Sequence, residues 1–212
     1  MRRIQIESDG YETARNAVQR SLPEADDAVV GIVRSIIEDV RQRGDEALLE
    51  LGCRFDAPCL DGLIVDDDEW DRGCAALDAG VADALKKAFQ SVVAFHERQR
   101  RSSWLDIADG QIKGQMLRPI DRVGVYVPGG RAEYPSSVIM AAGPASVAGV
   151  AEIVLCTPAR SDGSVSPAVL YAARIAGVRS VFKVGGAQAI AAMANGTAAV
   201  PRDDKIVGPG NS

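Results

Sequence analysis

Apolar residues recur at three- and four-residue steps in the first part of the chain, as they do on the buried face of an α-helix. The clearest stripe consists of Val29, Ile32, Val33, Ile36, Ile37 and Val40. This spacing predicts a helix that begins at Asp26 or Asp27, because a carboxylate there can accept hydrogen bonds from the first-turn amides. Gly44 is expected to end this helix.

Further helices are predicted downstream of the stripe. One covers 45–55 and stops before Pro58, and the next begins in the acidic run at 66–71, since carboxylates stabilise the first turn of a helix. A long helix is expected over 81–101. Residues 1–120 are therefore interpreted as a helical N-terminal region that leads into a short strand.

The pattern changes after this region, because short apolar runs begin to alternate with longer amphipathic segments. The apolar runs lie at 122–128, 152–158, 180–186 and 205–210. Strands alternating with helices indicate βαβ units and a parallel sheet. We therefore predict an α/β fold, in which 121–212 forms an incomplete Rossmann-like layer of four parallel strands. Pro144 is expected to kink the first helix of this layer or to shift its start.

Glycine-rich turns follow three of the predicted strands, at 127–130, 184–188 and 207–211. Ligands of open parallel sheets bind at the carboxyl ends of the strands, and glycine lets backbone amides approach an anion closely. The candidate binding residues in these turns are Pro128, Gly129, Gly130 and Gly186. The alternative is that each glycine only makes a tight turn. No G-x-G-x-x-G dinucleotide fingerprint is present.

Three side chains beside these turns are further candidates for ligand contacts. Tyr126 lies near the end of the first predicted strand, Gln188 opens a helix, and Asn211 follows a Gly-Pro-Gly turn. Each could instead cap or satisfy the local backbone. The spacing does not separate these two roles.

Composition excludes several classes of protein. The net charge of −5 argues against a nucleic-acid partner, which requires a basic face. No apolar stretch reaches the roughly 18 residues of a membrane span, and the first ten residues lack the apolar middle of a secretory signal. We therefore expect a cytoplasmic chain with no membrane partner.

The residues that usually carry metal or nucleophilic chemistry are scarce. The four cysteines (Cys53, Cys59, Cys74 and Cys156) form no C-x-x-C pair and are interpreted as free thiols. His96 is the only histidine, and zinc sites usually draw on two or more His or Cys side chains. We expect His96 to be a half-buried, hydrogen-bonded residue. No metal site and no catalytic residue are predicted from the spacing.

Several longer motifs, taken in order, resemble histidinol dehydrogenases. They are RPIDRVGVYVPGG (118–130), YPSSVIM (134–140), GGAQAIAAMANGT (185–197) and DKIVGPGN (204–211). The N-terminal region is similar to the same family in IIEDVRQRGDEAL (36–48), RFD (54–56) and FHERQ (95–99). The resemblance covers almost the whole chain and is to the N-terminal half of the family.

This resemblance implies a zinc- and NAD-dependent cytoplasmic homodimer of histidine biosynthesis. The full-length enzyme would oxidise L-histidinol to L-histidine through the aldehyde and pass two hydrides to NAD. Carried over by motif, the cofactor contacts fall on Tyr126 in VGVYVPGG, Gln188 in GGAQA and Asn211 in GPGN.

The resemblance places the family's zinc ligands and its glutamate-histidine acid/base pair beyond the GPGN motif. The 212-residue chain is therefore expected to bind a small-molecule ligand, at most weakly NAD, and to be inactive by itself. The alternative is a stand-alone ligand-binding or scaffold protein, or a paralogue, derived from that family. Self-association through exposed apolar surface, or association with a separate C-terminal half, is also expected.

Overall fold

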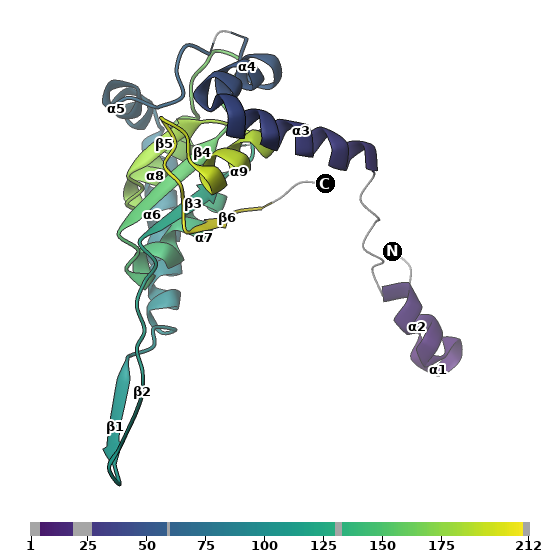
Figure 1. Ribbon diagram of the computed structural model, residues 1–212, viewed down its shortest axis with the longest axis vertical. Coiled ribbons are helices and arrows are strands. Elements are labelled where there is room, and N and C mark those ends of the chain that lie inside the picture. Colours follow the sequence, from purple (N-terminus) through teal and green to yellow (C-terminus); the bar gives the residue numbers. More distant parts are fainter. Residues whose placement is uncertain (1–4, 19–26, 59, 130–132, 210–212) are drawn as a thin grey trace. The chain divides into compact units, whose positions relative to one another are not determined.

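The computed structural model describes residues 5–18, 27–58, 60–129 and 133–209 (Figure 1). The chain divides into two compact units, 1–34 and 35–212. The first unit contains two short helices, α1 (Ile6–Asp9) and α2 (Tyr11–Val18), and the beginning of α3 (Asp27–Arg43). None of the described helices combines the length and apolar character that crossing a bilayer requires.

The helices predicted before the sheet are present with nearly the predicted bounds. They are α3, α4 (Asp45–Phe55), α5 (Asp67–Ala75) and α6 (Ala79–Glu97). Aspartates begin two of them: Asp66 accepts a hydrogen bond from the Glu69 amide at 2.6 Å, and Asp78 accepts from the amides of Gly80 and Val81. In α3 the predicted stripe is buried only at Val40, which packs with α4, whereas its N-terminal residues are exposed.

The structure adds a β-hairpin that the sequence pattern does not predict. Strand β1 (Trp104–Ala108) pairs antiparallel with β2 (Gln111–Gln115). Asp109 and Gly110 form the turn with φ of 53° and 73°, the left-handed backbone that an Asp-Gly hairpin turn uses. All ten strand residues are exposed, so the hairpin makes no contribution to the core.

The predicted parallel sheet is confirmed. Its strands are β3 (Arg122–Tyr126), β4 (Glu152–Thr157), β5 (Ser180–Lys183) and β6 (Lys205–Val207), in the order β5-β4-β3-β6. The connecting helices are α7 (Pro135–Ala148), α8 (Pro167–Ile175) and α9 (Gly186–Asn195). Pro144 lies inside α7, which continues beyond it. From β3 the sheet extends to β4 and then β5 on one side, whereas the last described strand, β6, pairs with β3 on its other side. The strand order therefore reverses at β3, which is the topological switch point.

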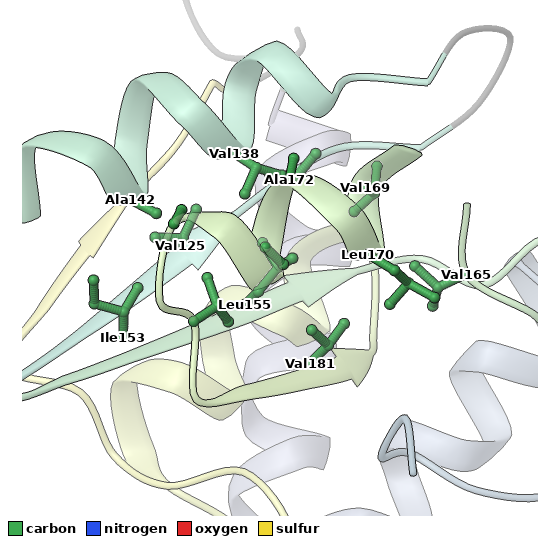
Figure 2. Close-up of a cluster of buried hydrophobic side chains, with 14 of the residues drawn as sticks. Val125, Val138, Ala142, Ile153, Leu155, Val165, Val169, Leu170, Ala172 and Val181 are labelled. Carbon is green, nitrogen blue, oxygen red and sulfur yellow. The ribbon is translucent and has the colours of Figure 1, made fainter. Parts of the chain in front are cut away.

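Helices bury both faces of the sheet, because alternate residues of each strand point to opposite sides. In β4, Leu155 faces a cluster with Val138 of α7 and Leu170 of α8 (Figure 2). Its neighbour Val154 faces a second cluster, which includes Met193 of α9 and residues of α4. The fold is therefore a layered α/β structure whose strands are apolar on both sides.

The segment before α5 covers the outer edge of β5. The Val65 amide donates to the Val181 carbonyl at 2.9 Å, and the Lys183 amide donates to the Leu63 carbonyl at 2.7 Å. The following helix is held by Trp70, whose indole nitrogen donates to the Leu170 carbonyl at 2.9 Å. These bonds protect an edge that would otherwise present unpaired amides and carbonyls.

Helices from before residue 120 also pack on the sheet layer. Helix α6 lies against α7 and α8, and α5 lies against α8. Trp70, Leu85 and Phe89 join the same apolar cluster as the sheet. The predicted division into 1–120 and 121–212 stays a prediction about domain organisation.

Asp203 is an unusual buried residue of the layer. Its side chain is 7% exposed, and neither carboxylate oxygen has a hydrogen-bond partner in the described part of the chain. It lies against Gly124 of β3, where an added Cβ would stand 2.2 Å from Asp203 Oδ2. Burial raises the pKa of Asp203 to about 7, with smaller contributions from Arg122, which lowers it, and from nearby carboxylates, which raise it.

We therefore predict that Asp203→Asn stabilises the protein at alkaline pH. Because the folded state retains a proton that the unfolded carboxylate releases, the free energy of unfolding falls as pH rises from about 4 through about 7. The variant should gain about 4 kcal/mol at pH 8 and about 1 to 2 kcal/mol at pH 5. Urea denaturation at both pH values measures this, with exposed Asp106→Asn as control. An equal effect of Asp203→Asn at both pH values would contradict the prediction.

Candidate functional site

A hollow of about 450 Å³ lies at the carboxyl ends of β3 and β4, beside the beginning of α9. This is the edge at which ligands of open parallel sheets bind. Its lining residues are Phe55, Asp56, Tyr126, Pro128, Gly129, Glu133, Tyr134, Thr157, Pro158, Ala159, Arg160, Ser161, Ser166, Val169 and Gly186. We refer to this hollow as the strand-end cleft.

The turns at the carboxyl ends of the strands are closely packed beside the cleft. Pro158 lies between two glycines: an added Cβ would stand 2.3 Å from its Cγ at Gly129 and 2.6 Å from its Cβ at Gly185. At Gly208, after β6, an added Cβ would stand 2.2 Å from the carbonyl oxygen of Tyr126. These glycines are therefore required for packing, which is the structural role left open by the sequence.

Tyr126 connects the end of β3 to the beginning of α9. Its hydroxyl accepts a hydrogen bond from the amide of Gly186 at 3.1 Å. The N-cap residue of α9 is Gly185, which has no side chain to accept such a bond, so Tyr126 provides the cap instead. The hydroxyl proton is left to donate elsewhere, and Tyr126 lines the cleft. Burial of this half-buried ring raises the pKa of the phenol, so the hydroxyl stays protonated at neutral pH.

Asp56 is a candidate that the pattern of strand ends does not reveal. It follows α4 and lines the cleft beside the beginning of α9: a Cβ added at Gly185 would stand 3.1 Å from Asp56 Oδ2. Oδ2 of Asp56 is buried and has no hydrogen-bond partner among the residues that the structure describes. Burial raises the pKa of Asp56, and the Gly185 amide partly offsets this. In the sequence, the only signal for Asp56 is its place in the RFD motif at 54–56.

A charged pair joins two loops of the cleft. Arg160, in the loop after β4, forms an ion pair through Nη2 with Oε1 of Glu133, which precedes α7. Both side chains line the cleft and are partly exposed, at 43% and 45%. From the sequence, Glu133 stands out as a carboxylate near a predicted strand end but has no visible partner, and Arg160 is not predicted, because their loops meet only in the folded structure.

The residues predicted from the sequence fall into three groups. Tyr126, Pro128, Gly129 and Gly186 line the cleft together. Gln188 is 3% exposed in the first turn of α9, with Oε1 close to Gly186, and is not among the lining residues. Gly130 and Asn211 lie outside the described residues. The assignment of these residues to cofactor contacts stays a prediction.

No group of three or more His, Cys, Asp and Glu side chains in the described ranges could hold a metal ion. His96 lies near the end of α6, half-buried, with Nδ1 2.7 Å from Oε1 of Gln99. It borders a different hollow, with Pro144 and Pro119, and does not line the cleft. The described thiols, Cys53, Cys74 and Cys156, are free, as expected.

We predict that Gly129→Ala destabilises the protein by about 1 to 3 kcal/mol, because the new methyl group overlaps the rigid ring of Pro158. Gly62→Ala is the matched control, since an added Cβ meets nothing within 4 Å at that position. Thermal and urea denaturation compare the two variants. Equal stability of the two would contradict the packing role of Gly129.

Comparison with known proteins gives the family. The family model for histidinol dehydrogenase matches residues 19–212. A protein of Geobacter sulfurreducens named histidinol dehydrogenase is 48% identical over 100% of this chain and 50% of its own length. One of Methanothermobacter thermautotrophicus, with the same name, is 46% identical over 98% of this chain and 49% of its own length.

A solved structure agrees with these relatives. The crystal structure of histidinol dehydrogenase from Elizabethkingia anophelis has a TM-score of 0.88 and 35% identity, covering 95% of this chain and 47% of that one. The chain therefore spans about half the length of the curated relatives it matches, and the resemblance to their N-terminal half is confirmed. The chain belongs to the histidinol dehydrogenase family.

Proposed function

We propose that this chain supplies the NAD-binding layer of a cytoplasmic histidinol dehydrogenase, which oxidises L-histidinol to L-histidine. One observation carries the proposal: in a chain of this family, Tyr126, Gly129 and Gly186 line a single cleft beside the switch-point strand of a Rossmann-like sheet. Ligand sites of doubly wound sheets lie at this position.

The residues of the cleft fit a dinucleotide. The glycine turns bring backbone close to a ligand, and the N-terminus of α9 presents its positive end at Gly186. Tyr126 can donate its hydroxyl proton to a ribose or carboxamide oxygen. Arg160 can meet a phosphate. NAD, when bound, supplies the hydride acceptor of the reaction.

The described residues do not fit zinc, and we assign no step to a metal in them. Removal of the alcohol proton requires a positioned base, which contributes about 10² to 10⁴ in rate. The single histidine lies on α6 and not at the cleft. The function proposed for this chain is therefore cofactor binding, with the base and the metal ligands supplied by polypeptide that corresponds to the other half of the relatives.

We predict that NAD binds to the chain and that L-histidinol is not turned over by the chain alone. NAD at about 100 times its dissociation constant should stabilise the fold by about 2.7 kcal/mol, which raises the melting temperature by about 5 to 10 °C. Differential scanning calorimetry and NADH absorbance measure the two properties. Stabilisation by neither NAD nor L-histidinol would favour a scaffold role and contradict the proposal.

We also propose that the chain self-associates through its hairpin. Leu105, Ile107 and Ile112 share one face of the two strands and are 67%, 69% and 71% exposed. An isolated two-stranded hairpin is at best marginally stable in water, and apolar surface of this kind is usually covered by a partner. A second copy can pair the same face with itself, as two-fold symmetric dimers do.

The prediction is that Ile107→Lys converts a dimer into a monomer without changing the melting temperature of the sheet layer. Light scattering with size exclusion over a range of concentrations measures the mass. Lys113→Ile is the control: Lys113 lies opposite Asp106 on the other face of the hairpin, so this substitution should leave the dimer intact. A clean monomer of the unaltered chain at high concentration would contradict self-association.

A further inference from the structure

The ion pair of Arg160 and Glu133 has a position that suggests more than a surface contact. The two residues belong to the loops after β4 and before α7, and both side chains line the strand-end cleft. Arg160 is the only lysine, arginine or histidine among the described lining residues. Among those residues, Arg160 is therefore the side chain that can offset the charge of an anionic ligand.

Acidic and basic side chains both line the described part of the cleft. Among the described lining residues, Asp56 and Glu133 carry carboxyl groups and Arg160 carries a guanidinium. Glu133 occupies that guanidinium in the structure described here. A phosphate that binds this guanidinium competes with the carboxylate for its donors, and the planar guanidinium suits either acceptor.

We propose that Arg160 is the phosphate-binding residue of this cleft and that Glu133 competes with the ligand phosphate for it. This rests on the proposed function, and it adds a specificity-determining residue to the same site. When the ligand binds, the Arg160 guanidinium exchanges the Glu133 carboxylate for a nucleotide phosphate as its partner, and the carboxylate becomes hydrated.

The relative strengths of the two partners permit this exchange. A partly exposed ion pair contributes a factor of about two to five to an equilibrium constant. A charge-assisted hydrogen bond to phosphate contributes about tenfold or more. The phosphate is therefore the stronger partner, while Glu133 lowers the apparent affinity of the cleft by the smaller factor.

The experiment is isothermal titration of the full chain and its variants with NAD. Arg160→Gln should raise the dissociation constant about tenfold, and Glu133→Gln should lower it about two- to fivefold. Arg160→Lys keeps the charge without the planar fork, so it should fall between the unaltered chain and Arg160→Gln. Thermal unfolding of each variant confirms that it is folded.

The chain offers a matched control at the opposite end of the same two strands. Arg122 begins β3 and pairs with Glu152, which begins β4, at 2.6 Å. Glu152→Gln removes a carboxylate from an arginine pair of similar exposure, far along the strands from the cleft. It should leave the affinity for NAD unchanged.

Three further ligands identify the group that Arg160 binds. Adenosine carries no phosphate, so its affinity should be the same in all variants. Inorganic pyrophosphate should show the Arg160 effect by itself. NADP carries an additional 2′-phosphate: a larger loss for NADP than for NAD in Arg160→Gln assigns Arg160 to that group, and equal losses assign it to the pyrophosphate.

The outcomes separate this proposal from the proposed function. Binding of NAD that is equally tight in Arg160→Gln, or not tightened by Glu133→Gln, overturns the role of the pair but supports the NAD-binding cleft. Binding of pyrophosphate but not NAD, lost in Arg160→Gln, supports Arg160 and overturns the NAD proposal. Binding of neither ligand overturns both.

Discussion

Burial of the parallel sheet on both faces is the constraint on which the arrangement of the molecule depends. Helices α7 and α8 cover one face, α9 and α4 cover the other, and the segment 63–65 pairs with the edge of β5. The strands can therefore meet a ligand only at their ends. At the carboxyl ends, close packing of Pro158 against glycines keeps the turns near one another, and the strand-end cleft lies above them.

Much of the fold could be predicted because local signals and tertiary packing agree. Aspartates precede α5 and α6, and the apolar runs of the strands match a sheet buried on both sides. The hairpin was missed because its strands contribute nothing to the core. Asp109-Gly110, flanked by alternating apolar residues, was the usable signal, since this dipeptide favours the turn that joins two antiparallel strands.

The candidate site was predictable only in part. Tyr126 ends a strand and Gly129 follows it, so their place at the carboxyl edge can be inferred from the sequence alone. Asp56 lies at the end of α4, which precedes the sheet by many residues in the chain. Arg160 contacts Glu133 only when two loops come together in the folded structure. No spacing rule encodes such contacts. Gln188 is predicted as a ligand contact from its position at the beginning of a helix, but this position does not show that its side chain is buried.

The hydrogen bond between Trp70 and the carbonyl of Leu170 joins residues 100 positions apart, and the edge pairing of Val65 with Val181 spans more. During synthesis at about 5 to 20 residues per second, the segment around α5 is made about 5 to 20 seconds before the elements that complete it. Throughout that interval the Trp70 indole and the Val65 amide lack these native hydrogen-bond partners. Nascent chains of this protein consequently depend on a late folding step, in which α8 and β5 complete the packing of a helix that is made about 100 residues before them.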